Sequence, residues 1–107
     1  MAAVNSLVLL SGTTTGDGAA GVVDASEYQV PYSVIIKGIA AGDTVTLFVS
    51  NDAIQPANSA AMTAFAAAIS ANGPVTIPAT FKWILANRTA NAGAGTVVAT
   101  LAASNRK

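Results

Sequence analysis

The stretch TVTLFVS, residues 44–50, decides the fold class. It is rich in β-branched and aromatic residues, a composition typical of strands. Apolar and polar residues alternate, so a strand places Val45, Leu47 and Val49 together on one face. The opposite face is otherwise polar and carries Phe48 as one large apolar side chain. We therefore expect a half-buried strand with Phe48 on the side away from the core.

Segments of the same kind recur along the chain, separated by glycine, asparagine, aspartate and proline, the residues of turns. The candidate strands are residues 4–10, 21–23, 28–37, 44–50, 75–77, 81–86 and 96–101. This rhythm predicts an all-β protein, an antiparallel β-sandwich or barrel of about seven short strands. The length predicts a single domain, residues 1–107, in which residues 1–20 are a candidate N-terminal arm.

Residues 60–71 fit two patterns. Met62, Phe65 and Ile69 have helical spacing, and the alanines between them favour a helix. With a period of two, Phe65 and Ile69 also share one face of a strand. We favour the strand, because the rest of the chain is β and Asn72–Gly73 would supply a hairpin turn into the next strand.

Charged residues make up only 9% of the chain, against about 25% in an ordinary soluble domain. Hydrophobic residues reach 52%, and five basic residues balance five acidic ones. Nucleic-acid binding needs a cluster of lysine and arginine side chains, whereas the basic residues here are scattered. No apolar stretch approaches the roughly 20 residues of a membrane span. We therefore expect neither a nucleic-acid partner nor a membrane partner.

Most side chains that carry catalysis are missing from the sequence. The chain has no cysteine and no histidine, which removes the thiolate nucleophile and the commonest general base. Asp17 and Asp52 stand in separate loops, whereas a calcium site gathers several oxygen ligands. No glycine-rich phosphate-binding motif occurs. We predict that the protein is not an enzyme and holds no metal ion or cofactor.

A chain with so little charge is expected to cover part of its surface with other protein. In residues 81–86, alternation places Phe81, Trp83 and Leu85 on one face, which we assign to the core, and Ile84 on the other. Two tyrosines flank a proline, a residue typical of edge strands, and are candidates for exposure. The candidate interface residues are Phe48, Ile84, Ile35, Tyr28 and Tyr32. The alternative is that a second layer of the same chain covers these apolar side chains.

Several segments resemble a pattern found in small structural proteins of tailed bacteriophages. They are residues 44–52 (TVTLFVSND), 68–73 (AISANG), 75–78 (VTIP), 81–86 (FKWILA) and 95–101 (GTVVATL). The family often has an arginine where this chain has Leu85, so a role of that arginine does not transfer. The resemblance implies a β-sandwich component of a virion, such as a capsid decoration protein or part of a fibre or spike. It carries no catalytic residues.

The first hypothesis is a capsid decoration (cement) protein on the virion surface. It would self-associate, as a trimer, and bind the major capsid protein or another virion protein through apolar and strand-edge contacts. The N-terminal arm would pair with the sheet edge of a neighbour. The alternative is a receptor- or glycan-binding module of a phage fibre or spike, with Tyr28, Tyr32 or Trp83 at the site. A small enzyme is the least favoured reading.

Overall fold

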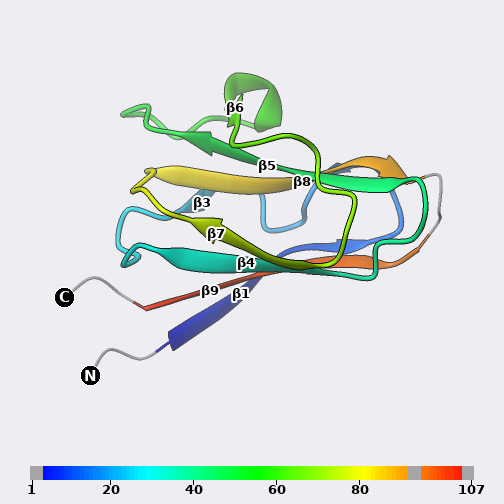
Figure 1. Ribbon diagram of the computed structural model, residues 1–107. Helices are drawn as coiled ribbons and strands as arrows, with labels where there is room; N and C mark the ends of the chain where they lie inside the picture. The colour runs from blue at the N-terminus through cyan, green and yellow to red at the C-terminus, as the bar shows by residue number, and fades with distance from the viewer. Residues whose placement is uncertain (1–3, 92–94, 105–107) are drawn as a thin grey trace.

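Two antiparallel β-sheets pack face to face, as Figure 1 shows. The computed structural model describes residues 4–91 and 95–104. The four-stranded sheet has the order β1-β9-β4-β7 and consists of β1 (Val4–Gly12), β4 (Tyr32–Lys37), β7 (Gly73–Ile77) and β9 (Val97–Ser104). The five-stranded sheet has the order β2-β8-β5-β6, with β3 also paired to β8, and consists of β2 (Gly16–Asp17), β3 (Val23–Asp24), β5 (Asp43–Ser50), β6 (Thr63–Ala64) and β8 (Trp83–Asn91). The predicted all-β class is confirmed, and the arrangement is that of a β-sandwich.

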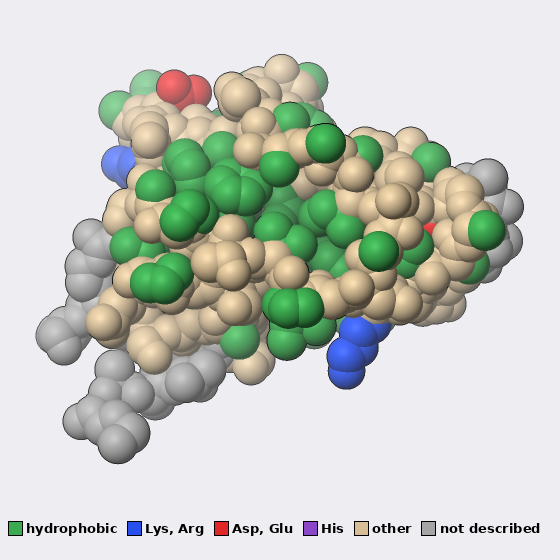
Figure 2. Space-filling view, viewed as in Figure 1, with side chains coloured by type: hydrophobic (Ala, Val, Ile, Leu, Met, Phe, Trp, Pro, Cys, Tyr) green, Lys and Arg blue, Asp and Glu red, His purple; other side chains and the backbone are tan. Residues whose placement is uncertain are grey.

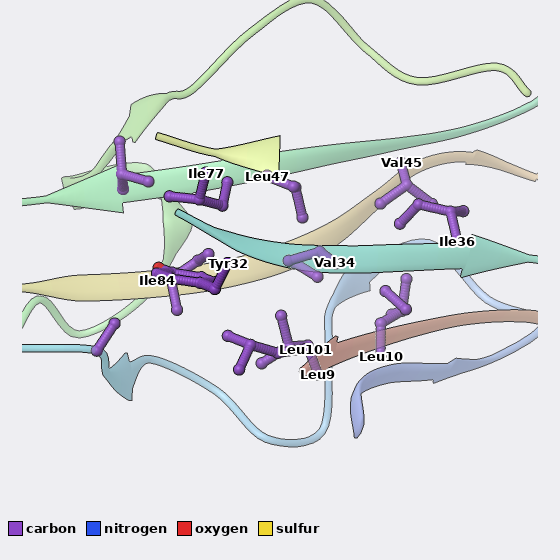
Figure 3. Close-up of a cluster of buried hydrophobic side chains, with 14 of the residues drawn as sticks. Leu9, Leu10, Tyr32, Val34, Ile36, Val45, Leu47, Ile77, Ile84 and Leu101 are labelled. Atoms are coloured by element: carbon purple, nitrogen blue, oxygen red, sulfur yellow. The ribbon is translucent and has the colours of Figure 1, made fainter. Parts of the chain in front are cut away.

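Strand β5 confirms the alternation predicted from its sequence. Val45, Leu47 and Val49 are buried between the sheets, the most exposed of them at 6%. In Figure 3, Val45 lies beside Ile36 of β4, which enters the core from the opposite sheet. The core is thus built mainly from branched aliphatic side chains at alternate strand positions.

The faces predicted for β8 are reversed in the structure. Ile84 and Ala86 belong to the buried core, so the prediction of Ile84 as an outward-facing interface residue is wrong. The cause is the strand register: directly paired residues share a face, and Ile84 pairs with the inward Val49. Trp83 and Leu85 face away from this core, yet they too are buried, at 9% and 1% exposure. Residues 83–86 are all apolar, so the sequence of this part of β8 did not show which face is buried in the core.

A loop of the same chain, residues 51–62, lies over the outer side of the five-stranded sheet (Figure 1). It contains a short 3-10 helix, η1 (Ser59–Ala61). The Trp83 indole N–H donates a hydrogen bond to the Asp52 carbonyl oxygen at 2.8 Å, which fixes one part of the loop. The Ser59 backbone N–H donates to the Asp17 carboxylate in β2 at 3.1 Å, which fixes another. This loop therefore forms a second layer over Trp83 on the outward side of β8.

Residues 60–71 form neither an α-helix nor a long strand. Only Thr63–Ala64 is strand, and it pairs with β5 opposite Val49 and Phe48. Further along, the Ile69 backbone exchanges two hydrogen bonds with Val45, of 2.7 and 3.0 Å. The favoured strand is therefore right for two residues and is otherwise replaced by an irregular edge of the five-stranded sheet.

The hairpin turn predicted at Asn72–Gly73 is wrong. β7 begins at Gly73, but it pairs with β4 in the other sheet and not with the preceding segment. The Asn72 side-chain oxygen accepts a hydrogen bond from the Ile39 backbone N–H at 2.8 Å. Asn72 thus fastens a crossing from one sheet to the other, which short-range sequence patterns do not predict.

The described part of the candidate N-terminal arm belongs to the sandwich itself. β1 pairs with β9 of the same chain and forms one edge of the four-stranded sheet. A β-bulge at Leu9 interrupts the pairing, and as a result Leu9 and Leu10 are both buried. Gly18 packs directly on this bulge, because a Cβ at that position would overlap the Leu9 carbonyl group. Residues 4–12 are therefore a built-in strand and not a detached arm.

One ion pair is buried completely at the end of the sandwich where β5 begins. Arg88 Nη2 of β8 lies 2.9 Å from Asp43 Oδ1 of β5, and both side chains have 0% exposure. Arg88 Nη1 donates to the Gly12 carbonyl oxygen of β1 at 2.6 Å. Asp43 Oδ2 accepts hydrogen bonds from the backbone N–H groups of Ala40 and Gly95, at 3.1 and 3.3 Å. The pair therefore links both sheets and two connecting segments.

Replacing Arg88 by methionine should destabilise the protein strongly, because it leaves the Asp43 carboxylate buried without its partner. We expect the free energy of unfolding in urea to fall by about 3–5 kcal/mol. The double variant Arg88→Met/Asp43→Leu should lose less, since it leaves no unpaired charge. Lys37→Met, at an exposed cation, is the control and should change stability by about 0.5 kcal/mol or less. Equal stability of Arg88→Met and Lys37→Met would contradict the structural role of the pair.

Candidate functional site

The outward side of the four-stranded sheet differs from that of the five-stranded sheet, because its side chains stay accessible. Val8 of β1 is 50% exposed and Ile35 of β4 is 39% exposed. We call this surface the outer face. Its outward residues are Ser6, Val8, Ser11, Ser33, Ile35, Lys37, Pro74, Thr76, Val98, Thr100, Ala102 and Ser104, all exposed or half-buried.

The strand register arranges the outer face in rows that cross all four strands. One row is Val8–Thr100–Ile35–Pro74, which is apolar except for one threonine hydroxyl. The next row is Ser6–Ala102–Ser33–Thr76, which consists of small, mostly hydroxylated side chains. Directly opposed residues on a sheet lie about 5 Å apart, so each row is continuous. The outer face thus presents an apolar band beside a band of short polar groups.

Charge is distributed unequally between the two sheets. Lys37 is the one charged residue among the described positions of the outer face. The exposed carboxylates of Asp17, Asp24, Glu27 and Asp52 lie on β2, β3 and the loops that follow β3 and β5. The outer face is therefore a nearly neutral surface on a protein whose accessible acids lie elsewhere.

The Asp17 carboxylate is occupied by the fold itself. Burial tends to raise its pKa, but hydrogen bonds from Ser59 and Asn87 outweigh this and hold the pKa below the ordinary aspartate value. The Asn87 side-chain N–H donates at 2.6 Å and the Ser59 backbone N–H at 3.1 Å. Asp17 therefore anchors the covering loop to β2 and β8. Within residues 4–91 and 95–104 there is no group of three acidic side chains that could hold a metal ion.

The five predicted interface residues do not form one site. Ile35 lies on the outer face, as a surface role requires. Phe48 is half-buried on the opposite sheet, next to β6, and Tyr28 is half-buried after β3. Ile84 and Tyr32 have 0% and 4% exposure, so both were wrongly assigned to the surface. Tyr32 occupies an inward position of β4, in phase with the buried residues that follow it in the strand.

Sequence reasoning missed Val8 on the surface and the buried pair of Arg88 and Asp43. Val8 lies in a wholly apolar run, and the bulge at Leu9 breaks the alternation that would assign its face. The ion pair had a signal in the sequence: Asp43 is in phase with the inward residues of β5. Arg88 is likewise in phase with Ile84 and Ala86, so one acid and one base fall on inward positions of two paired strands.

The aromatic residues proposed for glycan stacking are mostly inaccessible. The Tyr28 and Tyr32 rings meet edge to face, with centroids 5.7 Å apart, and Tyr32 is buried. Trp83 is bonded to the covering loop, and the Lys82 ammonium lies 5.7 Å from its ring centroid. Of the three proposed residues, Tyr28 alone keeps appreciable exposure, and a single ring is a poor sugar platform.

A small hollow of about 360 Å³ lies where β4 and β9 approach the same end of the sheet. Its lining residues are Gln29, Val30, Pro31, Tyr32, Ser33, Ala102, Ala103 and Ser104. The Val30–Pro31 peptide bond is cis. No charged side chain lines this hollow, so it adds polar backbone and hydroxyl groups to the end of the outer face.

A second apolar region lies along the side of the sandwich that carries the β6 and β7 edges. Figure 2 shows hydrophobic side chains gathered in the hollow between the sheets on this side, with charged side chains at the rim. The half-buried Phe65, Ile69 and Val75 pack against the core here. Phe65 also meets the Phe81 ring edge to face, at 5.9 Å between centroids. This region is the margin of the core, where Phe65, Ile69, Val75 and Phe81 are half-buried.

Comparisons with known protein families, with curated proteins and with solved structures found no match. Among the described residues, no helix has the length and apolar character needed to cross a membrane.

Alanine substitutions should separate the two isoleucines that the sequence analysis grouped together. Ile84→Ala removes a fully buried side chain and should lower the free energy of unfolding by about 2–5 kcal/mol. Ile35→Ala, at an exposed position, should lower it by about 1 kcal/mol or less. Urea denaturation measures both. A loss of about 1 kcal/mol or less for Ile84→Ala would contradict the reversed faces of β8.

The Tyr32 hydroxyl is buried and makes no hydrogen bond with any described residue. Tyr32→Phe should therefore leave the free energy of unfolding unchanged or raise it by about 1 kcal/mol. Burial, with a smaller contribution from Tyr28, raises the pKa of Tyr32 from 10.0 to about 12. The stability that follows from this shift is present below the unfolded pKa of 10.0 and lost as the pH rises towards about 12.

Urea unfolding at alkaline pH tests this linkage. We expect the wild-type protein to lose more stability than Tyr32→Phe as the pH passes 10.0, because unfolding lets Tyr32 ionise at its ordinary pKa. Parallel profiles for wild type and Tyr32→Phe would show that Tyr32 is not held neutral by burial.

Proposed function

We propose that the protein is a structural subunit of a virus particle, a capsid decoration protein that self-associates and binds the capsid surface. The single observation that carries this proposal is the outer face, which combines exposed Val8 and Ile35 with one charged residue. Contiguous apolar surface on a soluble protein marks sites of protein contact. Obligate interfaces are also more apolar than ordinary surface, which matches the low charge of the whole chain.

The arrangement of the two sheets supports a structural role over a catalytic one. One sheet is covered by the chain's own loop, while the other presents an open band of aliphatic and hydroxyl groups. Such a band has groups for packing and hydrogen bonding, and Lys37 is the one ionisable side chain among the described residues of the outer face. The resemblance to tailed-phage proteins suggests that the assembly is a virion. On its repeated surface, many weak contacts between copies of the chain and the capsid would add up to firm attachment.

The Ile35→Lys variant tests the outer face as the binding surface. It places a charge in the middle of the apolar row. Because Ile35 is exposed, lysine at this position should not disturb the fold of the free protein. We expect binding to virions stripped of this protein to fall at least about tenfold, equivalent to about 1.4 kcal/mol. Co-sedimentation of the purified chain with these particles measures the bound fraction.

Ile54→Lys is the matched control, because Ile54 is 83% exposed in the loop over the other sheet. It should bind as the wild type does. Two results would refute the proposal: virions purified from infected cells that lack the chain, or undiminished binding by Ile35→Lys. Binding of the isolated chain to glycans would instead favour a receptor-binding module.

A further inference from the structure

The free edges of the two sheets are protected very differently. β2, β3 and β6, which bound the five-stranded sheet, have two residues each, and very short edge strands offer little to pair with. β7 contains Pro74 and is followed directly by Pro78, and proline removes a backbone donor from an edge. β1, the remaining edge, has nine residues with no proline and no charge. Among the described edge strands, β1 is thus the one that is long and contains neither a proline nor a charge.

Only the first half of β1 is open for pairing. From the bulge at Leu9 onward, Gly18 packs on the strand and the Gly12 carbonyl is bonded to Arg88. No strand of the described chain pairs with the outer edge of residues 4–8. Alternate residues of an edge strand direct their N–H and C=O groups away from the sheet, so this segment presents unused ladder positions.

We propose that residues 4–8 of β1 pair antiparallel with the same residues of a second copy of this chain, around a two-fold axis beside Ser6. Two four-stranded sheets then join into one continuous sheet with β1 strands at its centre. This inference deepens the proposed structural role and rests on it for its biological purpose. A two-fold pair replaces the trimer that the sequence predicts.

The properties of the strand favour a second copy over a different partner. A two-fold interface brings each residue against its own kind, so any charge in the strand would repel its equivalent. Residues 4–8 carry no charge, and Ser6 and Val8 are exposed side chains that tolerate such a neighbour. A partner recognised by charge would find no complement here. The symmetric pair also extends the outer face, because the rows that contain Ser6 and Val8 continue into the neighbouring sheet.

The interface is small, since it consists of one five-residue strand pair, whereas a standard interface buries about 1,600 Å². We therefore expect a dissociation constant in the micromolar range. On a particle the local concentration of the chain is high, so most copies would be paired. Each pair would then bind the particle through two outer faces, one from each copy.

Cysteine cross-linking tests the pairing directly, because the chain has no cysteine of its own. Opposed residues of antiparallel strands have Cα atoms about 4.5–5.5 Å apart, within the range of a disulfide. We expect Ser6→Cys, oxidised at ~100 µM, which is about a hundredfold above a micromolar dissociation constant, to give mostly covalent dimer. Ser33→Cys is the matched control: it lies in the same row and on the same face, two strands further in. In the proposed pair its equivalents are about 24 Å apart, and it should give at least tenfold less dimer.

Light scattering provides a second measurement. At the same concentration the wild-type mass should approach twice the 10.6 kDa of the chain, and Ser6→Lys should return it to the monomer value. Ser33→Lys should remain dimeric. Equal cross-linking of the two cysteine variants, or a monomeric wild type, overturns the pairing.

The two proposals fail separately. A chain present on virions whose Ser6→Cys variant does not cross-link refutes the edge pairing alone. A chain that dimerises through Ser6 but does not bind virions refutes the capsid role and leaves the pairing intact.

Discussion

The buried ion pair of Arg88 and Asp43 is the interaction on which the sandwich depends. It connects β8 and β5 within one sheet, reaches Gly12 at the end of the other sheet, and holds the segment that leads into β9. Each charge is buried completely, so neither is tolerable without the other. Small residues make room for it: a Cβ on Gly95 would lie 2.8 Å from the Gly38 carbonyl oxygen and 3.2 Å from Asp43 Oδ2. The pair therefore fixes how the sheets meet at this end.

With the sheets fixed in this way, their two outer sides take different roles. The loop over the five-stranded sheet is held by Asp17 and by the Trp83 indole, so the chain itself covers part of that side. On the four-stranded sheet Val8 and Ile35 stay exposed, and within residues 4–8 the outer edge of β1 has no proline, no charge and no pairing with another described strand. The sparse charge of the chain follows the same division: Asp43 and Arg88 are buried, and Lys37 is the charged side chain among the described residues of the outer face.

The fold class could be read from the sequence because it depends on local alternation, which β5 shows in full. The assignment of faces could not be read for β8, since Trp83 and Ile84 are both apolar and only the pairing with β5 decides between them. The route from β6 to β7 was also hidden, because a change of sheet leaves no local signature at Asn72. For the candidate site, the alternation of β4 predicted the outward position of Ile35. The outward position of Val8 could not be predicted, because no glycine or other turn residue marks the bulge at Leu9.

The central claim is that the four-stranded sheet is the side of this protein that meets other protein. Hydroxyl-radical footprinting of the chain, free and attached to virions, tests it most directly, because it reports side-chain accessibility on both sheets at once. The account predicts that labelling of Val8 and Ile35 falls on attachment while labelling of Ile54 and Met62, on the covering loop, is unchanged. Protection of the loop with undiminished labelling of Val8 and Ile35 would contradict it.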